Sequence, residues 1–291
     1  MKKITTKATL MAFTMSLAAI FTSCESKSNN QQTQVEQTAD AEKDEAATPT
    51  DDIFFYTTRH RADKFVPTES KMGFGSAIEA IGIEEFKGNL NLKEIWFGPK
   101  VNHIANNAFD GCSNIEKMHF QGKVAVINDE AFMGCTSLKN LNVDVYTIGL
   151  NAFKGCSSLQ TARFGESIWW IREGAFAGCK NLRSVLMGIT MQKLEDGAFD
   201  GCTNIEEFSI PNDFKNRLFG MIPSSGKWKT IYLLSTEYYE MPKNCTPSSS
   251  CTLFVPDAFL QKFQADPGWS KFGSIEPLSK TKFFTAEGFW K

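Results

Sequence analysis

One short phrase recurs five times between Val101 and Pro211, and this repetition constrains the fold more than any other feature of the chain. Each copy reads Ala-Phe, one variable residue, Gly-Cys and then a segment rich in leucine and isoleucine. The repeated phenylalanines are Phe109, Phe132, Phe153, Phe176 and Phe199, in steps of 23, 21, 23 and 23 residues. A regular period in this range predicts a solenoid, in which each repeat forms one turn and packs on its neighbours.

Each position of the repeat predicts a structural role. A short apolar pair, such as Val145 and Ile148, should form one inward-facing edge of the turn. The Ala-Phe step should place a ring in the core, stacked on the ring of the next turn. The glycine permits a backbone turn, and the cysteine that follows should act as a small buried hydrophobe. The L-x-x-L-x-L segment alternates as a strand does, so each turn should add one strand to a parallel sheet.

The phrase AFxGCxxLxxLxL resembles the BspA-type leucine-rich repeat of bacterial surface proteins, closely over residues 76–211 and more loosely in the flanks. The resemblance implies a leucine-rich repeat solenoid, an α/β-type horseshoe that is mostly β with short turns. Its parallel sheet would lie on the concave side, with about 6–8 turns of roughly 23 residues and a cap at each end. Members of the family are described as surface or secreted proteins that bind host or bacterial partners.

The N-terminal segment has the features of an export signal. A basic start at Lys2 is followed by an apolar run over residues 8–21 and by small residues before Cys24. This run is shorter than the roughly 20 apolar residues of a membrane span. The segment resembles a bacterial lipoprotein signal peptide, residues 1–23, with FTSC as its lipobox and Cys24 as the lipidated residue. An ordinary signal cut nearby and an uncleaved anchor are the alternatives.

Composition divides the rest of the chain into five segments. Residues 24–52 carry no aromatic side chain and should form a disordered tether, because they have too little apolar surface to offset the entropy of ordering. We expect an N-terminal cap at 53–75 and the regular repeats at 76–211. Irregular repeats should follow at 212–252, and a C-terminal capping turn and tail at 253–291.

The C-terminal sequence predicts particular elements. Trp228, Ile231 and Leu233 can continue the strand pattern. A further strand is expected at residues 253–255, before a short helix that begins at Pro256. Pro267-Gly268-Trp269 then resembles the last turn of many proteins of this family. The aromatic residues beyond Ser279 should pack back on the solenoid.

Charge and motifs favour a protein that is not an enzyme. The chain has 31 basic and 33 acidic side chains, a net charge of −2, so no overall field favours nucleic acid or an anionic membrane as a partner. The histidines lack the HExxH spacing, and neither a GxSxG elbow nor a glycine-rich phosphate loop is present. We therefore expect no cofactor and no membrane contact beyond the lipid anchor.

The cysteines of the repeats and those near the C-terminus have different interpretations. Five recur once per turn and should lie in a row, whereas the ligands of a metal site converge on one point. We therefore predict no metal site. Cys245 and Cys251 instead flank a short loop, and a disulfide between them is as compatible with an exported protein as two free thiols.

Binding residues should lie at the outward positions of the strands, which can vary without disturbing the core. Aligning the turns places two columns on the main sheet, with the candidates Trp96, His119, Asn142, Arg163 and Tyr232 in one column and Glu94 and Lys117 in the other. A second candidate surface lies between the residues of the apolar pairs, at Tyr146, Trp169 and Trp170. Alternatively, one of these tryptophan rings lies flat over the adjacent turn as part of the structure.

Three functional hypotheses follow. The first is a monomeric, lipid-anchored protein of the outer membrane or cell surface that binds a protein or glycan through its sheet. The second is a structural or accessory subunit of an envelope complex, with Tyr146, Trp169 and Trp170 as its contact patch. An enzyme, the third, would need titratable side chains that meet in a deep pocket.

Overall fold

The computed structural model describes residues 54–56, 67–211, 227–241, 248–281, 284–285 and 288–289 of the 291-residue chain. All of them belong to one compact unit that spans Asp44–Lys291. The predicted signal peptide, Cys24, the tether and Cys245 lie outside the described residues, and these predictions remain open. Within the described part, no helix is both long enough and apolar enough to cross a membrane.

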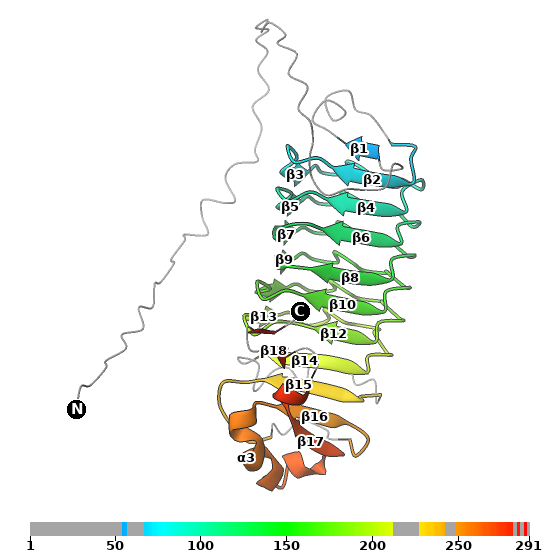
Figure 1. Cartoon of the computed structure of the whole chain (residues 1–291). Coiled ribbons are helices and arrows are strands. Elements are labelled where there is room, and N and C mark those ends of the chain that lie inside the picture. Colours follow the sequence, from blue (N-terminus) through cyan, green and yellow to red (C-terminus); the bar gives the residue numbers. More distant parts are fainter. Residues whose placement is uncertain are drawn as a thin grey trace, which may run out of the picture. The chain divides into compact units, whose positions relative to one another are not determined.

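The chain forms a parallel β-solenoid of about eight turns with little helix, as predicted (Figure 1). Its longer strands lie side by side in two parallel sheets, which together we call the long-strand ladder. The first sheet contains β1 (Phe54–Tyr56), β2 (Lys71–Phe74), β4 (Glu94–Phe97) and β6 (Lys117–Phe120). The second contains β8 (Asn140–Val143), β10 (Thr161–Phe164), β12 (Ser184–Leu186), β14 (Glu207–Pro211), β15 (Thr230–Leu234), β16 (Thr252–Val255) and β17 (Ser274–Pro277).

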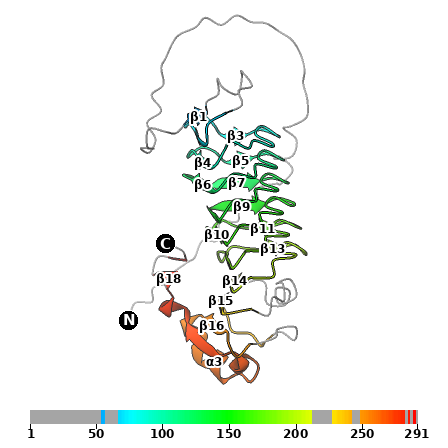
Figure 2. The ribbon, with the colours of Figure 1, turned by 90° about the vertical axis from the view of Figure 1, so that its right-hand side faces the viewer.

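Shorter strands make a third parallel sheet, of six strands, which we call the short-strand ladder (Figure 2). Its members are β3 (Ala80–Ile81), β5 (His103–Ile104), β7 (Val124–Ile127), β9 (Val145–Ile148), β11 (Trp170–Ile171) and β13 (Lys193–Leu194). In the shortened repeat, Asp144 alone separates β8 from β9. Its carboxylate accepts the Ser167 N–H at 3.0 Å and pairs with Lys123 at 3.4 Å, which joins the turns on either side.

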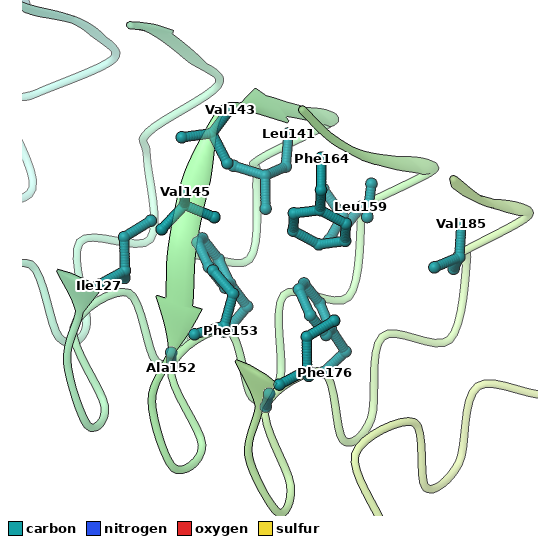
Figure 3. Close-up of a cluster of buried hydrophobic side chains, with 14 of the residues drawn as sticks. Ile127, Leu141, Val143, Val145, Ala152, Phe153, Leu159, Phe164, Phe176 and Val185 are labelled. Atoms are coloured by element: carbon teal, nitrogen blue, oxygen red, sulfur yellow. The ribbon is translucent and has the colours of Figure 1, made fainter. Parts of the chain in front are cut away.

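Stacked phenylalanine rings fill the core between the ladders, as predicted. Phe86, Phe109, Phe132, Phe153, Phe176 and Phe199 stack in sequence, with ring centroids 5.1–5.3 Å apart. Figure 3 shows Phe153 and Phe176 with Val143 and Val145 from the two ladders. The repeated rings therefore connect each turn to the next through the interior, where they are removed from water.

The repeated cysteines are buried, as predicted, and each also makes a specific contact. The thiols of Cys112, Cys135, Cys156, Cys179 and Cys202 each donate to the carbonyl of the phenylalanine one turn earlier, at 3.0–3.4 Å. Burial raises the pKa of Cys112 to about 11 and that of Cys156 to about 12, so these thiols stay protonated and able to donate. Because every turn repeats this thiol–carbonyl contact with the turn before it, every turn carries a cysteine at the same position.

Each turn needs two backbone positions in the left-handed region. The predicted position is the glycine before the cysteine, for example Gly155 with φ +76°. A second position, which was not predicted, lies two residues before each phenylalanine. It is occupied by Glu84, Asn107, Glu130, Asn151, Gly174 and Gly197, with φ between 53° and 72°. Asparagine and glycine tolerate this region better than other residues.

The C-terminal turn closes the core. The expected strands are present as β15 and β16, and the expected short helix is η3 (Asp257–Phe259) followed by α3 (Leu260–Ala265). Trp269, in η4 (Trp269–Lys271), is fully buried and packs on Phe263 with ring centroids 5.4 Å apart. The chain continues through η5 (Leu278–Lys280), and β18 (Phe284–Thr285) pairs antiparallel with β19 (Gly288–Phe289).

Candidate binding surfaces

The outward side of the long-strand ladder presents polar and aromatic side chains. In β4, Ile95 and Phe97 are buried, so the alternating residues Glu94 and Trp96 face outward. The parallel register of β4 and β6 sets Glu94 beside Lys117 and Trp96 beside His119. The repeat alignment predicted both columns correctly at these strands.

Glu94, Trp96, Lys117 and His119 form one contact network, which we call the Trp96 cluster. The Trp96 and His119 rings stack with centroids 4.7 Å apart and planes 13° from parallel. Nε2 of His119 lies 2.8 Å from Oε1 of Glu94, and Nζ of Lys117 lies 3.9 Å from the same oxygen. The His119 side chain remains 43% exposed. The cluster is thus ordered by its own contacts and is still open to solvent.

The same face continues onto β8 and β10, where the other predicted residues lie. Asn142 is paired in register with Arg163. In the neighbouring column, the Thr161 hydroxyl donates to Oδ1 of Asn140 at 2.8 Å. The face from β4 to β10 therefore offers an indole, an imidazole, a carboxylate, amides and cations on regularly spaced strands.

Tyr232 does not belong to this open face, contrary to the prediction. It stands in the expected column of β15 but is only 6% exposed, and its ring stacks on Phe254. Leu278, from the last part of the chain, packs in the same apolar cluster with Leu186 and Leu234. The alignment placed Tyr232 outward correctly, but it could not show that a distant segment covers this end of the face.

The outward side of the short-strand ladder carries a second aromatic group. Tyr146 and Trp169 are in register, and their rings stack with centroids 5.6 Å apart and planes 5° from parallel. Tyr146 is 46% exposed. Among the described residues, neither the Tyr146 hydroxyl nor the Trp169 indole N–H has a hydrogen-bond partner. We call these two rings the Tyr146–Trp169 pair; Tyr146 is exposed, and Trp169 is half-buried.

Trp170 has a different environment from Trp169. Its indole N–H donates to Oε1 of Glu195 at 3.1 Å. Nζ of Lys193 lies 4.1 Å from the ring centroid, and the Arg172 guanidinium lies 5.5 Å from it. Both tryptophans are half-buried, but these polar and cation contacts give Trp170 a structural role, whereas Trp169 contacts the exposed ring of Tyr146.

The partners of Trp170 were not identified from the sequence, although the repeat contained a signal for one of them. Lys193 occupies the Trp170 column one turn later, so the alignment could have found it. Arg172 and Glu195 lie just beyond the strands, where spacing alone does not specify contacts.

Potential metal ligands are dispersed over the described residues. No three His, Cys, Asp or Glu side chains in this part of the chain are arranged to hold a metal ion. Cys251 is buried, burial raises its thiol pKa to about 11, and its sulfur lies 3.6 Å from the Thr252 carbonyl oxygen. Because Cys245 lies outside the described residues, a Cys245–Cys251 disulfide stays a prediction.

Several solved structures of bacterial leucine-rich repeat proteins are similar to the chain. A leucine-rich repeat protein of T. pallidum is 25% identical, with a TM-score of 0.48, over 57% of this chain and 80% of that chain. For one from Bacteroides ovatus, the identity is 21%, the TM-score 0.35, and the coverage 71% of this chain and 66% of that one. A leucine-rich cell surface protein of Faecalibacterium prausnitzii is 16% identical, with a TM-score of 0.31 and coverage of 78% and 83%. No curated protein matches the chain.

The repeats themselves identify the family. The BspA type leucine-rich repeat region matches the chain in six copies, over residues 68–145 and 140–245. These matches span more than half of the 291 residues and include the Phe and Cys ladders. The chain therefore belongs to the BspA-type leucine-rich repeat family.

Proposed function

We propose that this chain is a non-enzymatic binding protein of the bacterial cell envelope, which recognises a protein partner through the long-strand ladder between β4 and β10. The Trp96 cluster is the observation that carries the proposal. Its stacked rings and its charges of both signs are held in place and yet exposed. Solenoid proteins commonly use such extended sheets for binding.

The chemistry of this face suits a protein more than other partners. Tryptophan and arginine are enriched among the residues that contribute most to protein interfaces, and Trp96 and Arg163 are both on this face. Glu94 and Lys117 give it charges of both signs, which favour a partner with a complementary pattern over a uniformly charged polymer. Because strand pairing already fixes the backbone here, little ordering entropy is lost on binding.

Attachment to the envelope is proposed from the sequence alone. The apolar run before FTSC and the polar composition of residues 24–52 support a lipid anchor at Cys24 with a tether to the solenoid. Such an anchor would hold the solenoid near a membrane without a membrane-spanning helix.

Partner capture with the full-length protein tests the proposal. The double variant Trp96→Ala/Arg163→Ala should fold and should retain its partner at least about tenfold more weakly than the wild type. Lys154→Ala, an exposed change in the turn outside both ladders, should have no effect. Equal capture by the double variant would remove the long-strand face from consideration.

The origin of the captured protein separates recognition from an accessory role. Capture from host or neighbouring-cell material would support recognition. Capture only from the protein's own membranes would favour the accessory-subunit alternative.

A further inference from the structure

The Tyr146–Trp169 pair lies next to a gap in its column of side chains. Five outward residues follow one another along the short-strand ladder: Asn102, Ala125, Tyr146, Trp169 and Gln192. One face of Tyr146 is covered by Trp169, whereas the neighbour on the other side, Ala125, presents only a methyl group. Among the described residues, no second ring contacts Tyr146. One face of its phenol ring is therefore open.

The gap has the size of one ring. Adjacent strands are about 4.8 Å apart, so Tyr146 and Asn102 are separated by two steps, or roughly 9–10 Å along the ladder. A six-membered ring lying on Tyr146 and above Ala125 fills this interval and reaches the Asn102 amide. The geometry thus suits a ligand that stacks one ring and forms hydrogen bonds at its edges.

Three cations near the Tyr146–Trp169 pair are already paired within the chain. Lys123, before β7, pairs with Asp144 at 3.4 Å. Arg172, after β11, pairs with Asp129 at 2.7 Å, and Lys193 in β13 pairs with Glu195 at 2.9 Å. An acidic ligand would have to compete for these cations and would meet the exposed carboxylate of Glu79, which adjoins Asn102 one turn earlier, so the surface favours a neutral ligand over an acidic one.

The groups without internal partners are neutral donors and acceptors. The Tyr146 hydroxyl and the Trp169 indole N–H have no hydrogen-bond partner within the described residues, and Asn102 and Gln192, on either side of the aromatic pair in the same column, are exposed. Sugar hydroxyls can satisfy such groups. The C–H groups on one side of a pyranose ring also match the negative face of an aromatic ring.

We propose that Tyr146 and Trp169, with the gap above Ala125, form a binding site for a pyranose ring of a neutral glycan. This site goes beyond the proposed function, because it lies on the other ladder and uses different residues. Trp170, held by Glu195, Lys193 and Arg172, keeps the supporting strand and its neighbour Trp169 in position.

An array of neutral oligosaccharides (glucans, mannans, galactans and xylans), with sialylated, uronic-acid and peptide probes alongside, tests the proposal on the full-length protein. The wild type should bind at least one neutral oligosaccharide. Tyr146→Ala and Trp169→Ala should each weaken this binding about tenfold. Ala125→Leu keeps both aromatic rings but fills the gap, and it should weaken binding as strongly.

Ile83→Ala serves as the control, because Ile83 is 66% exposed and lies outside both aromatic surfaces. This variant should bind as the wild type does. Three outcomes would each overturn the proposal. In the first, the wild type binds no neutral glycan. In the second, Ala125→Leu leaves glycan binding unchanged. In the third, the Tyr146–Trp169 pair binds only the acidic or peptide probes. Loss of partner capture by Trp96→Ala/Arg163→Ala concerns the other ladder and leaves this test unaffected.

Discussion

At the scale of single residues, the cysteines show how one residue type can indicate very different chemistry. Five thiols at a regular spacing could suggest disulfides or a metal site. Here each donates to a phenylalanine carbonyl of the preceding turn, for instance Cys156 to Phe132 at 3.3 Å. The thiol at this position therefore joins successive turns through a polar contact inside an apolar core.

Thiol reactivity follows from this burial. Because burial raises the pKa of Cys156 to about 12, hardly any thiolate exists near neutral pH in the folded state. We predict that the five ladder cysteines resist alkylation in the native protein and react fully after unfolding. Site-resolved mass spectrometry after iodoacetamide treatment checks this, and rapid native alkylation at Cys135 or Cys156 would contradict the buried ladder.

A pair of glycine variants tests the second left-handed position of the turn. At Gly174, with φ +64°, a Cβ atom would collide with the Asn151 side chain, whereas at Gly155, with φ +76°, a Cβ would meet no atom within 4 Å. Gly155→Ala should cost about 1 kcal/mol of unfolding free energy from backbone strain alone. Gly174→Ala should cost more, about 2–3 kcal/mol, from strain plus the collision.

Urea denaturation of the two variants measures this difference. Equal losses would indicate that the Asn151 side chain moves aside without cost, contrary to the packing described for this turn.

At the scale of elements, the C-terminal cap contains a carboxylate, Asp266, whose pKa is lowered by the fold. The hydroxyl of Tyr238 donates to Oδ2 of Asp266 at 2.7 Å, and the N–H groups of Trp269 and Gly268 donate to Oδ1. These hydrogen bonds, that of Tyr238 most strongly, lower the pKa of Asp266 below its usual 3.8. The unfolded chain then takes up this proton at a higher pH than the folded chain does. The stabilisation is complete above the unfolded pKa and is lost as the pH falls through the folded pKa.

Asp266→Asn should reduce this pH dependence. Between about pH 6 and about pH 3, the Tm of the wild type should fall further than that of the variant. Asp266 is partly exposed, so the difference corresponds to less than about 1 kcal/mol. Thermal melts of both proteins across this pH range measure the effect. The same change of Tm with pH in both proteins would contradict the prediction.

The turn illustrates what the sequence could and could not predict at this scale. Phe, Cys and the following strand were predictable, because the same residue types recur at the same places. The second left-handed position was missed, because Glu84, Asn107 and Gly174 share a backbone conformation but no side-chain chemistry. A repeated conformation without a repeated residue leaves no period to find.

At the scale of the whole molecule, the repeat predicted the long-strand ladder, but neither that the apolar pairs form a sheet of their own nor what covers the open face. The columns through Trp96, His119 and Arg163 followed from the alignment of the turns. The burial of Tyr232 did not, because Leu278 reaches it from outside the repeats. Contacts between residues far apart in the sequence have no periodic signal, so the extent of the open face required the structure.

The proposed lipid anchor gives a prediction for the full-length protein in a bacterial cell. Cys24→Ser should abolish incorporation of a labelled fatty acid and should shift the protein from the membrane fraction to the soluble fraction, because the anchor is proposed as the only membrane contact. Labelling that persists in the variant would place the modification elsewhere.

The central claim is that the Trp96 cluster contacts the partner. Hydroxyl-radical footprinting of the full-length protein, alone and with its captured partner, tests it most directly. Trp96 and His119 should be oxidised several times more slowly in the complex, whereas Trp169, on the other ladder, should be oxidised at the same rate in both. Equal oxidation of Trp96 with and without the partner, together with protection of another surface, would contradict the claim.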